Sequence, residues 1–155
     1  MDNLFLEKAN SLLQDNKAVI TLLSNASALI YAEMDKLNWA GFYLLKGDTL
    51  LLGPFQGKVA CTEIKIGKGV CGTCIKEDST IIVDNVLECK NHIACDSNSR
   101  SEICIPIHIN NELYGLLDID SPIFSRFSQN DKDYLEKLVK IIEENIEKID
   151  NKKIV

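Results

Sequence analysis

Apolar residues recur at helical spacing at both ends of the chain. Between about Lys17 and Met34 they return every three or four positions, which predicts a helix. A weaker pattern over residues 2–15 predicts a shorter helix before it. Near the carboxyl end, Ser128 with Asp131 three residues later has the form of a helix N-cap. A long amphipathic helix is therefore expected from there to about Ile149, with an apolar face formed by Leu135, Leu138, Ile142, Ile146 and Ile149.

The middle of the chain has the patterns of strands. Apolar or alternating runs predict strands at residues 38–45, 50–55, 62–66 and 80–84. The first two are separated by a turn sequence and form a predicted hairpin. Residues 67–77 begin with glycines and predict a turn that enters a short helix. Residues 85–101 lack periodicity and are rich in Asn, Ser and Cys, which predicts a long loop of the kind that is often functional.

The clearest hairpin is predicted for residues 102–109 and 113–120. Odd positions carry the isoleucines of the first arm, so these positions are expected to face the core together with Leu113, Leu117 and Ile119 of the second arm. The even positions then share the opposite face. Pairing across a three-residue loop, Asn110 to Glu112, sets Glu102 near Asp120 and Cys104 near Asp118.

Three carboxylates, those of Glu102, Asp118 and Asp120, are therefore expected to converge on one face of the sheet. Acids packed together raise one another's pKa, so one of them is expected to hold a proton near neutral pH. Such a cluster can bind an ammonium group or donate a proton. The alternative is an ordinary solvated sheet face, which antiparallel sheets often have.

The order of elements predicts one α+β domain over residues 1–155. Helix, antiparallel strands, short helix, strands and helix follow one another without a linker or an internal repeat. The expected architecture is a central antiparallel sheet with the terminal helices packed mainly on one face. A chain of 155 residues that is 46% hydrophobic and 26% charged can bury such a core.

The charge balance and the termini exclude some partners. The net charge is −6 and the basic residues are scattered, which argues against nucleic acid. No segment is apolar enough to span a membrane, and the amino end lacks the pattern of a signal peptide. A cytoplasmic protein is expected, with thiols that stay reduced.

Six cysteines make thiol or metal chemistry the main open question. The stretch Val70-Cys71-Gly72-Thr73-Cys74 suggests a thioredoxin-like motif, but that motif belongs in a βαβ unit, which the predicted order lacks. A reactive thiol in the long loop could instead form a disulfide with a neighbour. Buried cysteines without chemistry are also common, and this is the favoured interpretation of Cys104. A zinc site is the remaining alternative, with the candidate ligands Cys71, Cys74, Cys89, His92 and Cys95.

Several stretches from Asn38 onward resemble the free methionine-(R)-sulfoxide reductase family, whose members are single GAF domains. The matching stretches are "NWAGFYLL" (38–45), "LGPFQGK" (52–58), "AC" (60–61), "GKGVCGT" (67–73), "HIACD" (92–96), "SRSEI" (99–103), "GLLDIDSP" (115–122) and "RF" (126–127), and "LLSNASALIY" (22–31) fits as well. The resemblance implies a GAF fold with a ligand pocket under loops on the sheet face away from the terminal helices.

The resemblance implies a catalytic cycle based on thiols. The expected reaction is reduction of free L-methionine-(R)-sulfoxide to methionine, with thioredoxin regenerating the enzyme and with no cofactor or metal. Cys95 matches the nucleophile and Cys61 the resolving cysteine, while Cys71 matches a third thiol of less certain role. Glu102 is expected to polarise or protonate the sulfoxide oxygen.

The resemblance also implies the residues that hold the substrate. Trp39 and Tyr43 match an aromatic wall, and Asp118 and Asp120 match acids that hold the ammonium group. The backbone amides of the loop are expected to bind the substrate carboxylate, and they belong to Ile93, Ala94, Cys95 and Asp96.

Two cysteines depart from the family pattern, and one rival function remains. Cys74 stands where the family usually has a small residue, and Cys89 stands where it often has phenylalanine, so non-standard disulfides become possible.

The rival function is that of a GAF domain without catalysis that senses a small molecule. GAF domains often pair through their terminal helices, so a homodimer is a further expectation.

Overall fold

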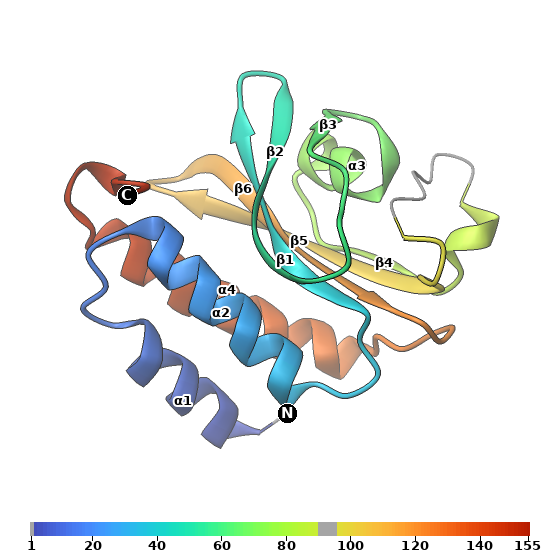
Figure 1. Ribbon diagram of the computed structural model, residues 1–155, viewed down its shortest axis with the longest axis horizontal. Coiled ribbons are helices and arrows are strands. Elements are labelled where there is room, and N and C mark those ends of the chain that lie inside the picture. The colour runs from blue at the N-terminus through green and yellow to red at the C-terminus, as the bar shows by residue number, and fades with distance from the viewer. Residues whose placement is uncertain (1, 90–95) are drawn as a thin grey trace.

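The computed structural model describes residues 2–89 and 96–155. Six strands form one sheet in the order β3-β2-β1-β6-β5-β4, and all neighbouring strands are antiparallel (Figure 1). The elements of the described residues are α1 (Asn3–Leu13), α2 (Val19–Glu33), β1 (Trp39–Lys46), β2 (Thr49–Gly57), β3 (Glu63–Lys65), α3 (Gly69–Glu77), β4 (Ile81–Val83), the 3-10 turn η1 (Val86–Glu88), β5 (Ser101–Ile109), β6 (Glu112–Ser121), α4 (Gln129–Glu147) and the 3-10 turn η2 (Asp150–Lys152).

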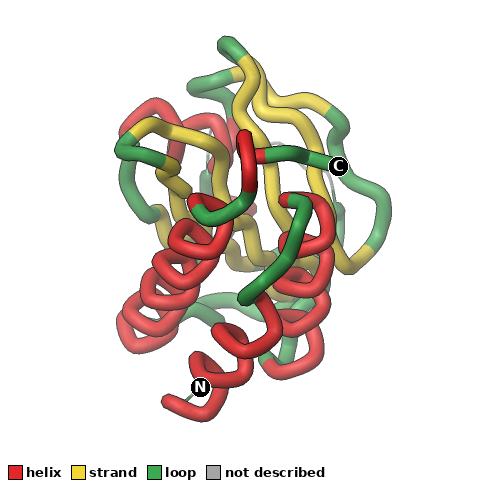
Figure 2. The backbone as a smooth tube through the Cα atoms, turned by 90° about the vertical axis from the view of Figure 1, so that its left-hand side faces the viewer, coloured by secondary structure: helices red, strands yellow, loops and turns green. Residues whose placement is uncertain are grey.

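The helices divide between the two faces of the sheet. α1, α2 and α4 lie on one face and contact one another, while α3 lies on the other face (Figure 1; the first three lie side by side in Figure 2). The larger apolar core fills the space between α1, α2, α4 and the sheet. A second, smaller cluster lies between the sheet and α3. No helix in the described ranges is long and apolar enough to cross a membrane.

The predicted elements are confirmed, with ends that shift by a residue or two. α4 begins where the sequence predicts, because the Ser128 side chain accepts a hydrogen bond from the Asp131 amide and the Asp131 carboxylate accepts one from the Ser128 amide. This reciprocal capping satisfies two amides that a helix start leaves unpaired. The predicted long loop contains η1, whose first turn is capped by the Asn85 side chain.

The turn of the last hairpin differs from the prediction. It has two residues, Asn110 and Asn111, both with positive φ, and Ile109 pairs with Glu112. A bulge between Ile107 and His108 then shifts the register by one residue, as bulges do. The shift restores the predicted pairs, so Glu102 lies opposite Asp120 and Cys104 lies opposite Asp118.

The same bulge makes one face assignment wrong. Leu113 was expected on the core face but packs with the second cluster, while Tyr114 packs against the larger core. Leu113 lies between the turn and the bulge, where side-chain alternation is inverted relative to the rest of the hairpin, and Tyr114 is the extra residue of the bulge. Beyond the bulge, Leu117 and Ile119 are buried in the larger core as predicted.

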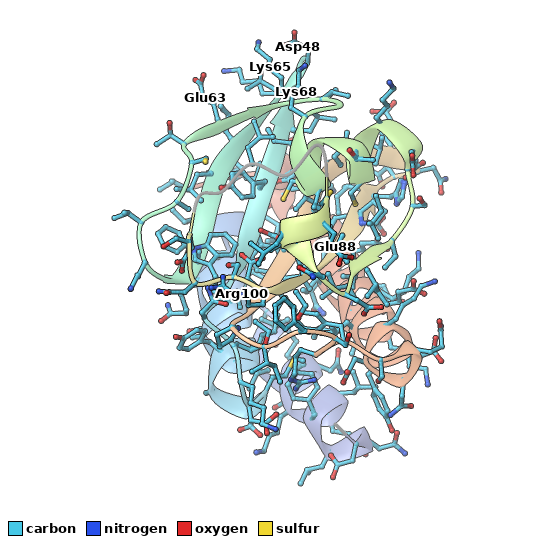
Figure 3. The ribbon with its side chains drawn as sticks, turned by 90° about the vertical axis from the view of Figure 1, so that its right-hand side faces the viewer. Asp48, Glu63, Lys65, Lys68, Glu88 and Arg100 are labelled. Carbon is cyan, nitrogen blue, oxygen red and sulfur yellow. The ribbon has the colours of Figure 1, made fainter. Side chains whose placement is uncertain are left out.

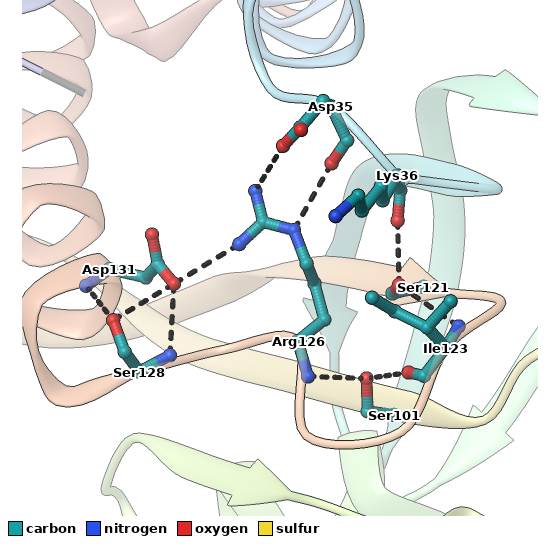
Figure 4. Close-up of polar contacts among 8 residues, drawn as sticks. All are labelled: Asp35, Lys36, Ser101, Ser121, Ile123, Arg126, Ser128 and Asp131. Carbon is teal, nitrogen blue, oxygen red and sulfur yellow. Dashed lines mark hydrogen bonds and ion pairs between the residues drawn. The ribbon is translucent and has the colours of Figure 1, made fainter.

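Arg126 joins three segments that are distant in the sequence (Figure 4). Its guanidinium donates to the Asp35 carboxylate and to the Asp35 carbonyl, each at 3.1 Å, and to the Asp131 carboxylate at 3.2 Å. Its backbone amide donates to the Ser101 hydroxyl. The Arg126 side chain is only 14% exposed, so the contacts are partly shielded from water. These bonds fix the end of α2 and the start of α4 beside the start of β5.

Replacing Arg126 with alanine is expected to lower the free energy of unfolding by about 1–3 kcal/mol, because charge-assisted hydrogen bonds made by a mostly buried guanidinium are lost. The measurement is urea denaturation. Lys65→Ala is the control, since the Lys65–Asp48 pair is exposed (Figure 3) and such pairs contribute at most about 1 kcal/mol. Equal losses in the two variants would contradict this account of Arg126.

Candidate active site

A pocket opens on the sheet face that carries α3. Apolar residues line one part of it, and the predicted acids line another. Lys68, which immediately precedes α3, is at its edge and lies near Lys65 in Figure 3. The lining residues are Trp39, Tyr43, Val59, Ala60, Ile64, Lys68, Gly69, Val70, Cys71, Asp96, Ser99, Glu102, Asp118 and Asp120.

Gly72 allows α3 to pack closely enough to form the wall of this pocket. A Cβ atom at Gly72 would lie 2.5 Å from the carbonyl oxygen of Lys65, which is closer than real Cβ atoms approach. The Gly72 carbonyl also accepts a hydrogen bond from the Gly67 amide at 2.8 Å. The predicted turn into a short helix is confirmed, and this close approach places Cys71 beside β5.

The predicted acid cluster is buried. Glu102 and Asp118 are each 5% exposed, and Asp120 is half-buried opposite Trp39 on β1. The alternative of a solvated sheet face is therefore wrong, because α3 and the neighbouring loops cover this face. Two thiols complete the cluster: Cys71 and Cys104 both lie within hydrogen-bond range of Glu102 Oε1, at 3.8 and 3.5 Å.

Burial dominates the protonation of the acids. It raises the pKa of Glu102 well above the usual range, and the charges of Asp118 and Asp120 raise it further. Burial, with the charges of Asp118 and Asp96, also raises the pKa of Asp120. A protonated acid beside an ionised one can donate a proton to a ligand while its neighbour binds a cation.

Replacing Glu102 with glutamine is expected to change the free energy of unfolding in a pH-dependent way. The change is expected to be more stabilising at pH 8 than at pH 4. The pKa of Glu102 is raised in the folded state, so its stabilising contribution is complete below the unfolded value of 4.5 and is lost as the pH rises through the folded value. Glutamine does not ionise and still accepts hydrogen bonds from Cys71 and Cys104. Urea denaturation at both pH values should show a relative gain on the order of 1 kcal/mol at pH 8. An equal change at both pH values would contradict the shift.

The thiols of this cluster are poor nucleophiles. The hydrogen bond with Cys104 lowers the pKa of Cys71, but burial and the charges of Asp118 and Asp120 outweigh it and raise that pKa to about 12. Burial also raises the pKa of Cys104 and of Cys74, which is fully buried. Attack requires a thiolate, so these three thiols are unsuited to attack a substrate at neutral pH.

Cys61 is in a different chemical state. It is half-buried and disulfide-bonded, whereas Cys71, Cys74, Cys89 and Cys104 are free thiols. The backbone carbonyl of Cys61 accepts a hydrogen bond of 2.8 Å from the Tyr43 hydroxyl. Tyr43 lines the pocket, so this bond ties the disulfide-bonded Cys61 to the pocket wall.

Aromatic side chains form the predicted wall. Trp39 is 2% exposed and stacks between Tyr43 and Phe55, with ring centroids 6.0 and 5.1 Å apart. Its indole nitrogen donates to the carbonyl of Lys58. Gly41 makes this packing possible, because a Cβ there would lie 2.3 Å from Cβ of Phe55. The stacked rings offer an apolar surface to a ligand.

Asp96 lies at the pocket, and Asn38 and Ser99 position it. The Asn38 amide donates to Asp96 Oδ2 at 2.9 Å and to the Ser99 hydroxyl at 3.0 Å, while Asp96 Oδ1 accepts from the Asn98 amide. Burial acts to raise the pKa of Asp96, but the hydrogen bonds from Asn98 and Asn38 outweigh it and lower that pKa. These hydrogen bonds favour the ionised form of the Asp96 carboxylate.

Asn38, Ser99 and Lys68 were not predicted as site residues. Asn38 and Ser99 fall inside stretches that carry the family resemblance, which is the signal that could have indicated them. The predicted nucleophile Cys95, the predicted loop residues Ile93 and Ala94, and the zinc candidate His92 lie outside the described residues.

The fold and the pocket define the class of protein. The family model of the GAF domain matches residues 4–146. The free methionine-R-sulfoxide reductase of Escherichia coli is 44% identical over 144 residues, which cover 93% of this chain and 87% of that protein. The reductase of the same name from Saccharomyces cerevisiae is 48% identical over 128 residues, covering 77% and 71% of the two chains.

A solved structure agrees with these relatives. The fRMsr of Staphylococcus aureus in complex with its substrate superimposes on the chain with a TM-score of 0.88 and 51% identity, over 92% of this chain and 94% of that one. The chain belongs to the free methionine-R-sulfoxide reductase family, as the motifs predicted.

Proposed function

We propose that this chain reduces free L-methionine-(R)-sulfoxide to L-methionine. The observation that carries the proposal is the pocket itself: a buried Glu102–Asp118–Asp120 cluster faces the Trp39 wall, with the disulfide-bonded Cys61 tied to that wall. The E. coli and yeast relatives are named for this activity. We assign all of residues 1–155 to one GAF domain.

The pocket chemistry fits each part of a free amino acid sulfoxide. Asp118 and Asp120 bind the ammonium group, and the Trp39 ring packs on the methyl–sulfur end. Backbone amides of Ile93, Ala94, Cys95 and Asp96 bind the carboxylate. Protonated Glu102 donates to the sulfoxide oxygen and so activates the sulfur.

The thiol cycle conserves atoms and electrons. The thiolate of Cys95 attacks the sulfoxide sulfur, the oxygen passes to Cys95 as a sulfenic acid, and the two-electron reduction leaves methionine. The Cys61 thiol then displaces water from the sulfenic acid and forms a disulfide with Cys95. Thioredoxin supplies two electrons and two protons by thiol–disulfide exchange, which restores both thiols.

Cys71 has a supporting role in this scheme. Its thiol remains protonated and donates to Glu102 Oε1, so it orients the acid instead of attacking the substrate.

We further propose a homodimer formed through the terminal helices and a location in the cytoplasm, where thioredoxin keeps the enzyme reduced.

The test is NADPH consumption coupled through thioredoxin and thioredoxin reductase. Each free epimer of methionine sulfoxide is supplied in turn, and a peptide containing methionine sulfoxide serves as the third substrate. Turnover is expected with the free R epimer alone. No turnover with that epimer, together with tight binding of a small ligand by calorimetry, would instead favour a GAF sensor.

A further inference from the structure

Four side chains of the acid cluster have the geometry of an unassigned metal site. One oxygen or sulfur atom of each of Cys71, Glu102, Cys104 and Asp118 lies within 4.8 Å of the others, and all four residues are buried. The two sulfurs are 3.5 Å apart. Cys104 Sγ lies 3.5 Å from Glu102 Oε1 and 3.1 Å from Asp118 Oδ1, and Cys71 Sγ lies 3.8 Å from Glu102 Oε1.

These four separations are close to edges of a tetrahedral zinc site, and the other two are within 4.8 Å. With zinc–sulfur bonds of about 2.3 Å and zinc–oxygen bonds of about 2.1 Å, the edges are about 3.8 Å between sulfurs and about 3.6 Å between sulfur and oxygen. The observed distances therefore differ from these edges by about half an ångström or less. Cys71, Glu102 and Asp118 also line the pocket, which gives an ion a route to the cluster.

We propose that Zn²⁺, or another divalent cation that prefers sulfur, binds to Cys71 Sγ, Cys104 Sγ, a Glu102 oxygen and an Asp118 oxygen. Metal–sulfur bonds replace the two thiol protons, the metal–oxygen bond to Glu102 replaces its carboxyl proton, and the displaced protons leave to solvent. Two thiolates favour zinc over magnesium and calcium, which prefer oxygen ligands only. The sequence-based zinc hypothesis included Cys71 but not the other three ligands.

A bound ion would occupy the acids that the reaction uses. Glu102 could no longer donate a proton and Asp118 could no longer hold an ammonium group, so the ion would act as a reversible inhibitor that competes with substrate. This consequence rests on the proposed function, whereas the metal site itself does not.

The test uses Co²⁺ as a spectroscopic substitute for Zn²⁺. Protein with the Cys61 disulfide intact is titrated without reductant, after alkylation of a denatured sample and peptide mapping have verified that Cys71, Cys74, Cys89 and Cys104 are free. One Co²⁺ per chain is expected to bind, with thiolate-to-cobalt charge-transfer absorption and tetrahedral ligand-field bands. Added Zn²⁺ is expected to abolish these bands, whereas added Mg²⁺ is expected to leave them unchanged. Absence of the thiolate band would overturn the proposal, whether or not the chain reduces sulfoxides.

Cys104→Ala and Cys104→Ser are the diagnostic variants, and Cys74→Ala is the matched control because Cys74 is a buried free thiol outside the cluster. Each Cys104 variant is expected to weaken binding of Co²⁺ and Zn²⁺ by roughly 100-fold or more. Whatever sulfoxide turnover each variant retains is expected to be insensitive to Zn²⁺. Binding as tight as that of the unmodified protein in both Cys104 variants, or equal weakening in Cys74→Ala, would refute the site.

Discussion

Replacing Cys95 with serine is expected to lower sulfoxide reduction by about 10³-fold or more, because the reaction loses its only proposed nucleophile. The other thiols near the acids cannot substitute for it, since Cys71, Cys74 and Cys104 are buried with raised pKa values. The measurement is methionine released in a single turnover, without thioredoxin, by protein that has first been reduced.

Cys61→Ser separates attack from recycling. This variant is expected to release about one methionine per chain in the first turnover and then to stall, because the sulfenic acid on Cys95 has no resolving thiol. A sulfenic acid trap should label it. Cys89→Ser is the matched control, since Cys89 is half-buried like Cys61 but is a free thiol, and it should keep full turnover. If Cys61→Ser alone lacks the first turnover, the two roles are reversed.

The hairpin that carries the acids could be predicted well because two local rules constrain it. Strand alternation fixed the shared face of Glu102, Asp118 and Asp120, and pairing across the turn set Glu102 opposite Asp120. The predicted turn was one residue too long, and the bulge after Ile107 compensated for it. A bulge depends on how the turn and the strands fit together, so the pattern could not reveal it, and the face of Leu113 was therefore wrong.

The burial of the acids and the contacts of the buried thiols could not be predicted from the sequence. Nothing in the local pattern indicates that α3 covers the acids, because the covering requires the close approach of Gly72 to the Lys65 carbonyl. Cys104 was interpreted as a small core hydrophobe, and it is fully buried, but it also donates to Asp118 and contacts Cys71. Such contacts join residues distant in the sequence, and spacing carries no information about them.

Replacing Glu102 with glutamine is expected to lower the rate of methionine formation by about 10²- to 10⁴-fold, the usual range for loss of a general acid. Glutamine keeps the size and the oxygen acceptor for Cys71 and Cys104, but it cannot transfer a proton to the sulfoxide oxygen. Substrate binding should change less than the rate, since Asp118 and Asp120 hold the ammonium group. Single-turnover rates and calorimetric binding of the sulfoxide measure the two effects separately.

The pH profile distinguishes proton donation from a structural effect. Because burial and the neighbouring acids raise the pKa of Glu102, the unmodified enzyme should be active at neutral pH and lose activity as the pH rises through that folded value. Glu102→Gln should lack this alkaline decline, after correction for the ionisation of Cys95. Glu143→Gln is the control. Glu143 is a buried carboxylate on α4, on the sheet face opposite to α3, and it accepts a hydrogen bond from the His108 backbone amide. A rate near that of the unmodified enzyme in Glu102→Gln would assign proton donation to another group, and Asp120, whose pKa is also raised, would be the next candidate.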